Sequence, residues 1–231
     1  MFSTKAKWRI GYLTAITLFC LKQPCMAAVN QDLQLWTPIT LDGRLYKNYR
    51  GYLEITPRLG NNITRLNQLL LRPAIQYKFN DGLSLFAGYL WQTNYQNGEV
   101  LREHRLWEQA LFNKDIKRFS IINRTRLEQR MFPHLSDIGN RLRHLLKFEY
   151  DLSDKWYLVT SDELFVNINS VKNGPKAGID QNRIFAEVGM RPRKRMRIEI
   201  GYQYQYVNRS DQFDDLGNHA ILVQTFIGIK D

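Results

Sequence analysis

Apolar and polar side chains alternate along the stretch Arg195–Tyr206, RMRIEIGYQYQY. Its even positions are Met, Ile or Tyr, and its odd positions are Arg, Glu, Gly or Gln. Strand side chains alternate with period 2, so a β-strand separates these sets onto opposite faces, whereas a helix mixes them. An apolar face with tyrosines toward one end is typical of a barrel strand with lipid on one side and a lumen on the other. A soluble β-sandwich strand shows the same alternation, so the rest of the chain has to distinguish the two.

The same alternation predicts further strands along the chain. From Tyr49 onward we predict ten strands, at residues 49–59, 68–79, 83–93, 104–113, 119–130, 141–150, 156–167, 183–190, 195–206 and 219–229. A weaker candidate at 32–40, followed by an Asp42-Gly43 turn, either adds to them, making twelve with an unidentified partner strand, or packs elsewhere. Pro57 and Pro73 interrupt two of the strands, and we expect β-bulges there.

The predicted connections alternate between short and long. Short turns are expected near 80–82, 114–117, 151–155 and 191–194, the first being the hairpin signal Asn-Asp-Gly. Longer polar loops are expected near 60–66, 94–102, 131–140, 168–181 and 207–217. Short turns at one rim and long loops at the other are the arrangement of outer-membrane barrels.

Residues 1–28 have the pattern of a cleaved secretory signal peptide. A basic start precedes the apolar run Ile10–Leu21 and the short segment Pro24–Ala28, which ends in small residues. The apolar run is shorter than the roughly 20 residues that a spanning helix needs. We expect cleavage after Ala28 or Ala27. An N-terminal anchor is the alternative, and the residues before the two cysteines make a lipoprotein a weaker one.

Removal of this segment changes the cysteine content and the charge. Cys20 and Cys25 both lie within it, so the mature chain has neither disulfides nor cysteine-ligated metals. The formal net charge of +11 falls by four, to +7, because the segment's only charged residues are Lys5, Lys7, Arg9 and Lys22. An excess of basic residues often indicates a protein that binds nucleic acid. Export favours anionic lipopolysaccharide or a solvated lumen instead.

About 200 residues remain, enough for one domain, which we place at 29–231. Charged residues interrupt every later apolar stretch, so a membrane-spanning form has to be a closed barrel, which satisfies all backbone groups in lipid. The expected partners are outer-membrane lipid and lipopolysaccharide, together with periplasmic chaperones and the barrel-assembly machinery. We expect no nucleic acid partner, and the oligomeric state stays open.

Charged residues concentrate on the polar faces of neighbouring strands, where antiparallel pairing allows arginine and glutamate to bind each other in a bidentate manner. We predict a lumenal charge network of Arg124, Arg126, Glu128, Arg130, Arg141, Arg143, Lys147, Glu149, Glu163, Arg183, Arg197 and Glu199. One interpretation is a set of salt bridges that fills a small barrel. The other is a charged constriction that selects anions.

Candidate catalytic residues are few. The histidines are His104, His134, His144 and His219, and none stands in a nucleophile motif or a metal-binding spacing. A serine hydrolase needs a serine, a histidine and an acidic side chain that lie close together in space. Ser161 and the Glu103-His104 pair are the only candidates for such a site. Phosphate-binding glycine loops are absent, and we expect no catalytic residue, metal or cofactor.

Several motifs resemble the domain-of-unknown-function 2490 family of exported Gram-negative proteins. They are EHRLWEQ (Glu103–Gln109), RTRLEQR (Arg124–Arg130), DELFVN (Asp162–Asn167) and QNR (Gln181–Arg183). The resemblance covers nearly all of the mature chain and implies a barrel-like outer-membrane protein, without an activity, a ligand or catalytic residues. Many such barrels end on an aromatic residue, whereas here Phe226 is followed by Ile-Gly-Ile-Lys-Asp.

These features predict an exported, all-β, antiparallel up-and-down transmembrane barrel of about ten strands in the outer membrane of a Gram-negative cell. We expect a non-enzymatic protein, either a narrow pore or a structural envelope protein. The alternatives are an outer-membrane barrel enzyme that modifies lipid, and a soluble periplasmic β-protein whose apolar face another sheet would cover.

Overall fold

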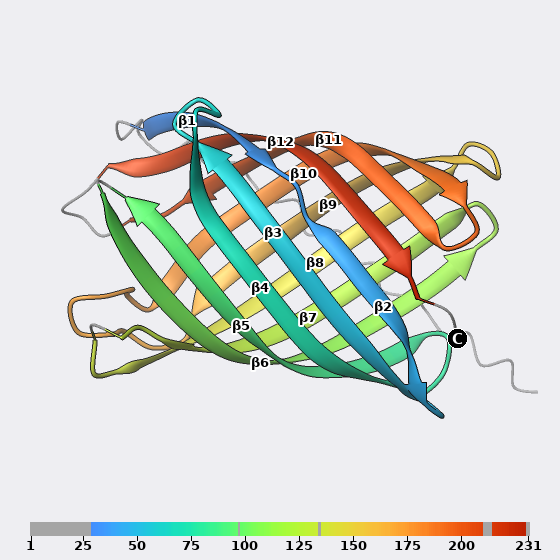
Figure 1. Cartoon of the computed structure of the whole chain (residues 1–231), viewed down its shortest axis with the longest axis horizontal. Helices are drawn as coiled ribbons and strands as arrows, with labels where there is room; N and C mark the ends of the chain where they lie inside the picture. Colours follow the sequence, from blue (N-terminus) through green and yellow to red (C-terminus); the bar gives the residue numbers. More distant parts are fainter. Residues whose placement is uncertain (1–28, 97, 134, 210–213, 230–231) are drawn as a thin grey trace, which may run out of the picture.

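Twelve strands form one closed barrel (Figure 1). The computed structural model describes residues 29–96, 98–133, 135–209 and 214–229, so the predicted signal peptide lies outside the described residues. The strands are β1 (Val29–Trp36), β2 (Ile39–Tyr46), β3 (Tyr49–Gly60), β4 (Arg65–Lys78), β5 (Leu83–Gln96), β6 (Glu99–Ile116), β7 (Phe119–Met131), β8 (Ile138–Asp151), β9 (Trp156–Asn167), β10 (Gly178–Arg193), β11 (Met196–Val207) and β12 (Asp215–Gly228).

The all-β barrel prediction is confirmed, including the ten strands from Tyr49 onward, which correspond to β3–β12. Each of these strands pairs with the next along the chain, in the order of an up-and-down barrel. All of these pairs are antiparallel. Within the described residues no helix is long and apolar enough to cross a membrane.

The first two strands close the seam of the barrel. β1 runs parallel to β12, from the pair Val29–Asp215 to the pair Trp36–Leu222. After a break at Thr37-Pro38, β2 continues in the same direction, pairing with β3 and with the end of β12. The segment 32–40 is therefore part of the wall. β1 and β2 share one position in it, so the wall is eleven strands around.

The expected Asp42-Gly43 turn is wrong, because both residues pair within β2. The chain turns instead at Lys47-Asn48, where Lys47 has a φ of 48°. The turn moves along the chain because Asp42 pairs with both β3 and β12, and Gly43 with β3, so a strand that extends to Tyr46 satisfies more backbone groups than a turn at Asp42-Gly43 would.

Two of the five expected long loops are short. Only residues 61–64 connect β3 to β4, and only residues 97–98 connect β5 to β6. Pairing extends both hairpins beyond the alternating stretches that the sequence displays. The loops after β7, β9 and β11 are the longer ones, and Figure 1 places them at the end opposite the short turns.

The two prolines behave differently. A register shift lies beside Pro57, between Arg58 and Leu59, as the bulge prediction expected. At Pro73 the register is unchanged, so the second bulge prediction is wrong. The β4–β5 ladder instead skips Arg72 and Pro73, because proline has no N–H to donate.

The wall separates the two faces that the alternation predicted. Leucine, isoleucine, valine and aromatic side chains lie exposed on the outside, among them Ile75, Leu106, Leu164, Ile184 and Ile200. Most of the buried polar and charged side chains point inward. The barrel interior is thus the place where charged chemistry is concentrated.

A charged interior with an arginine-lined vestibule

All residues of the predicted charge network lie on the inner face of the wall, in strands β7–β11. Their alternation along each strand puts them there, and the pairing register decides which of them meet. They form two groups, one toward the long loops and one toward the short turns. Each buried carboxylate in these groups forms ion pairs with several cations.

Glu128 is the centre of the group toward the loops and is fully buried. Arg141 Nη2 donates to it at 2.6 Å and Arg143 Nη1 at 2.7 Å. Arg105 Nη1 lies 3.5 Å away. Because buried carboxylates need paired charges and hydrogen bonds to offset lost hydration, these arginines hold Glu128 in place.

Glu163 is the second centre. Arg124 Nη2 and Arg143 Nη2 each donate to its Oε1 at 2.7 Å, and Arg183 Nη1 lies 3.9 Å from its Oε2. Arg143 therefore bridges Glu128 and Glu163 across strands β7, β8 and β9. This bridging follows from the register, which places Arg126 opposite Arg143 and Arg143 opposite Phe165.

The network prediction missed Glu103, which is the partner of Arg130. Arg130 Nε donates to Glu103 Oε1 at 2.6 Å, and Arg105 donates to both carboxylate oxygens at 2.7 and 2.9 Å. It also missed the pair Arg72–Glu54, at 2.5 Å. In each case the signal was available, because these residues share the polar parity of their strands.

The second group lies nearer the short turns. Lys147 Nζ is 3.0 Å from both Glu149 and Glu199, and Tyr157 donates its hydroxyl to Glu199 at 2.9 Å. Arg197 Nη1 lies 3.6 Å from Glu149. The predicted residues thus form two neighbouring clusters rather than one.

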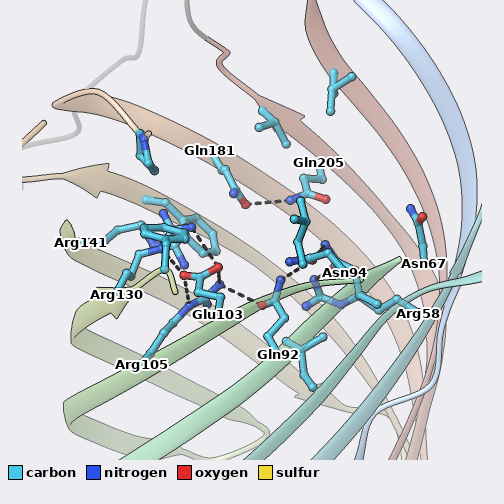
Figure 2. A pocket seen from close by; sticks show the side chains of 18 of the residues that line it. Arg58, Asn67, Gln92, Asn94, Glu103, Arg105, Arg130, Arg141, Gln181 and Gln205 are labelled. Carbon is cyan, nitrogen blue, oxygen red and sulfur yellow. Dashed lines mark hydrogen bonds and ion pairs between the residues drawn. The ribbon is translucent and has the colours of Figure 1, made fainter. Parts of the chain in front are cut away.

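A vestibule of about 510 Å³ opens inside the loop end of the barrel. Its charged lining is mostly arginine, with only Asp32 and Glu103 as acidic residues among the described positions. The arginines are Arg58, Arg72, Arg102, Arg105, Arg130, Arg141, Arg143 and Arg183. Figure 2 shows Arg105, Arg130 and Arg141 around Glu103 on one side, with Arg58 on the other. Amide side chains such as Gln92 and Asn94 lie between them.

Arg58 has no carboxylate partner within ion-pair distance in the described part of the chain. Its guanidinium carbon lies 3.7 Å from the Trp36 ring centroid, and its Nη1 donates to Gln68 at 2.9 Å. The buried Nε atoms of Arg58 and Arg183 have no hydrogen-bond acceptor. Arg58 therefore contributes to the vestibule a positive charge that no carboxylate within ion-pair distance offsets among the described residues.

The middle of the barrel is packed along one side. Leu70, Phe86, Leu90 and Trp107 form a buried cluster on β4–β6. On the opposite side, solvent reaches the side chains of Arg124 (23 %), Lys147 (12 %) and Arg197 (39 %).

The three described histidines lie on the outer face. His104 hydrogen-bonds to the hydroxyl of Tyr89, His219 to Tyr202 at 2.6 Å, and His144 to Thr125 at 3.0 Å. Ser161 points inward, so the wall separates it from them. His134 lies outside the described residues. Among those that are described, no group of His, Cys, Asp and Glu is arranged to hold a metal ion.

Comparisons with known proteins agree with the fold. The sequence model of the family described as "Protein of unknown function (DUF2490)" matches residues 33–216, which confirms the resemblance drawn from the four motifs. An uncharacterized protein of Methylorubrum extorquens is 34% identical over 204 residues, or 85% of this chain and 88% of that protein. The solved structure of the NanC porin has a TM-score of 0.52 at 12% identity, covering 86% of this chain and 99% of that chain. At that identity the likeness concerns the fold alone.

Proposed function

We propose that this chain, which belongs to the DUF2490 family, is an outer-membrane barrel that admits small anionic solutes through the arginine-lined vestibule and passes them along a narrow path. The predicted signal peptide would carry it to the periplasm. Chaperones and the barrel-assembly machinery would then insert it.

The outer surface supports membrane insertion. Large apolar side chains stay exposed all around the wall, an arrangement that is costly in water and favourable in lipid. Aromatic side chains gather near the short turns, including Tyr49, Phe79, Phe119 and Trp156. The Tyr49 and Tyr77 rings lie 5.0 Å apart, and those of Phe119 and Tyr150 lie 4.7 Å apart. Such girdles mark the membrane interface in outer-membrane barrels.

The observation that carries the anion preference is the excess of arginine in the vestibule. Six of the eight lining arginines share the carboxylates of Glu54, Glu103, Glu128, Glu163 and Asp180, whereas Arg58 and Arg102 have no ion pair among the described residues. Fields from one sign of charge add within a low-dielectric wall and concentrate counter-ions. Rings of arginine and lysine are the usual means of selecting anions in pores.

The path from the vestibule would follow the partly exposed cations on β7, β8 and β11. Arg183 and Arg124 share Glu163, and further down Lys147 and Arg197 share Glu149. Alternating cations and carboxylates would let an anion move between sites without binding any of them too tightly.

A structural envelope role is the second candidate, and the buried cluster around Trp107 favours it. Trp107 is 1 % exposed and Leu90 is fully buried, so these side chains fill part of the barrel cross-section. In small barrels side chains can fill the interior without leaving a passage.

Conductance of the purified protein in a planar lipid bilayer tests the proposal. We expect discrete steps and, under a salt gradient, a reversal potential that indicates anion preference. A heat-modifiable protein that inserts without conducting would support the structural role, and lipid hydrolysis would then be assayed for the enzyme alternative. A protein that is soluble without detergent would rule out the membrane proposal.

A further inference from the structure

A groove of about 660 Å³ lies on the outer face of the barrel, on strands β8–β11. Its two walls are Phe148 on one side and Tyr202 on the other, with Thr160 and Ala186 between them. The groove is lined almost entirely by apolar side chains that point away from the lumen.

The pairing register explains the groove. Phe148 pairs with Thr160, Thr160 with Ala186, and Ala186 with Tyr202, so one row runs large, small, small, large. Neighbouring strands are about 4.8 Å apart. The backbones that carry the two aromatic walls are therefore three strand spacings apart, about 14 Å, and the aromatic rings occupy part of that distance. The trough between the rings has room for a hydrocarbon chain but is narrower than a helix, whose diameter is about 10–12 Å.

Toward the short turns the next row of outward side chains is Tyr150, Leu158, Val188 and Ile200, which also line the groove. The three turns next to the groove carry exposed cations, and the exposed carboxylates there are Asp154 in the β8–β9 turn and Asp115 near the end of β6. The cations are Lys117, Arg118, Lys155, Arg193, Lys194 and Arg195. Figure 1 shows the turns β6–β7, β8–β9 and β10–β11 at the same end of the barrel.

We propose that this face binds one anionic phospholipid, with an acyl chain in the groove and the phosphate at Lys155 and Arg193. The inference rests on the proposed membrane location. Two features point to this occupant: the groove matches an alkyl chain, and the basic turns stand at the level of lipid headgroups. Basic clusters at that level attract anionic lipids.

The test measures retention of dioleoyl phosphatidylglycerol and of dioleoyl phosphatidylcholine by native mass spectrometry. The full sequence is expressed in a Gram-negative host, and the exported protein is purified in detergent. We expect one phosphatidylglycerol to be retained where phosphatidylcholine is lost. Lys155→Gln with Arg193→Gln should lower that retention by roughly fivefold per cation. Arg44→Gln with Lys47→Gln, on the same rim but away from the groove, is the matched control and should change nothing.

A second pair of variants tests the groove itself. Ala186→Leu fills the trough and should weaken retention of phosphatidylglycerol, by about fourfold for each displaced CH₂. Ala87→Leu makes the same change at an outward position of β5 and should leave retention unchanged. If Ala186→Leu fails to fold, the exposed turn variants still decide the question.

Equal retention of both lipids by the wild-type protein, or unchanged retention in both groove and turn variants, would overturn the lipid site. If the protein inserts into phosphatidylcholine bilayers and is heat-modifiable but shows no lipid preference, the lipid site is refuted and the proposed function is not. A protein recovered from the periplasm without detergent would overturn the lipid site and the proposed function together.

Discussion

Replacing Arg58 by glutamine should reduce anion preference without unfolding the barrel. Arg58 lines the vestibule, stacks on Trp36 and donates to Gln68, and it has no carboxylate within ion-pair distance among the described residues. The change leaves no buried carboxylate uncompensated. It removes one neutral-acceptor hydrogen bond and one cation–π contact, each worth about 1 kcal/mol. Neutralising Arg143 would be a poorer test, because it would remove one cation from both Glu128 and Glu163 and so disturb the buried network as well as the vestibule charge.

The expected magnitude follows from Coulomb's law. A unit charge about 6 Å from a monovalent anion contributes about 0.7 kcal/mol at the dielectric constant of water. That energy corresponds to roughly threefold in local anion occupancy. Water in a vestibule walled by protein screens less than bulk water, which raises the effect, whereas dissolved salt lowers it, so threefold is the estimate for low salt. A Debye length of about 10 Å at 0.1 M salt implies that the effect should shrink in 1 M salt.

The assay is the reversal potential of single channels under a KCl gradient, at low and at high ionic strength. Arg58→Gln should shift the anion-to-cation permeability ratio about threefold toward cations at low salt. Arg58→Lys, which keeps the charge, should shift it little. Arg118→Gln removes the same charge at the opposite rim and serves as the control. An unchanged ratio in Arg58→Gln at low salt would refute the assignment of the vestibule as the selective element.

Three further predictions concern the wall and its filling. Glu128→Gln leaves two buried guanidinium groups short of their carboxylate and should cost about 3–5 kcal/mol, measured by denaturant unfolding in detergent. Gly189→Ala should cost about 1–3 kcal/mol in the same assay, because an added Cβ would lie 2.2 Å from the Tyr157 ring. Leu35→Cys with Ile221→Cys should form a disulfide on oxidation, because the two residues are paired in the parallel seam.

The controls use neighbouring positions. Glu108→Gln removes a carboxylate from the exposed outer face, where Gln129 donates to it at 3.1 Å, and should change stability little. Cys at Val223 in place of Ile221 stands two residues out of register and should not cross-link efficiently to position 35. Efficient cross-linking of that mismatched pair would contradict the seam register. Full stability of Glu128→Gln would contradict the role given to the buried carboxylate.

Most of the confirmed predictions rest on the alternation of apolar and polar residues along single strands. The sequence by itself determined which residues of RTRLEQR, RLRHLLKFEY and RMRIEIGYQYQY face inward, because period 2 is a local property of the backbone. It also determined that the outer face is apolar. The same parity would have identified Glu54 and Glu103 as inward-facing carboxylates.

Only the tertiary structure decided how those faces are assembled. The pairing register chose Glu103 as the partner of Arg130 and divided the predicted network into two clusters. Asp42 and Gly43, which the sequence predicted as a turn, became part of a seam strand when the barrel closed. There β2 pairs with backbone groups of both β3 and β12. The groove beside Ala186 arises from four strands at once. Local pattern fixes the direction of a side chain, whereas its neighbours depend on contacts between residues far apart in the chain, which a single strand does not encode.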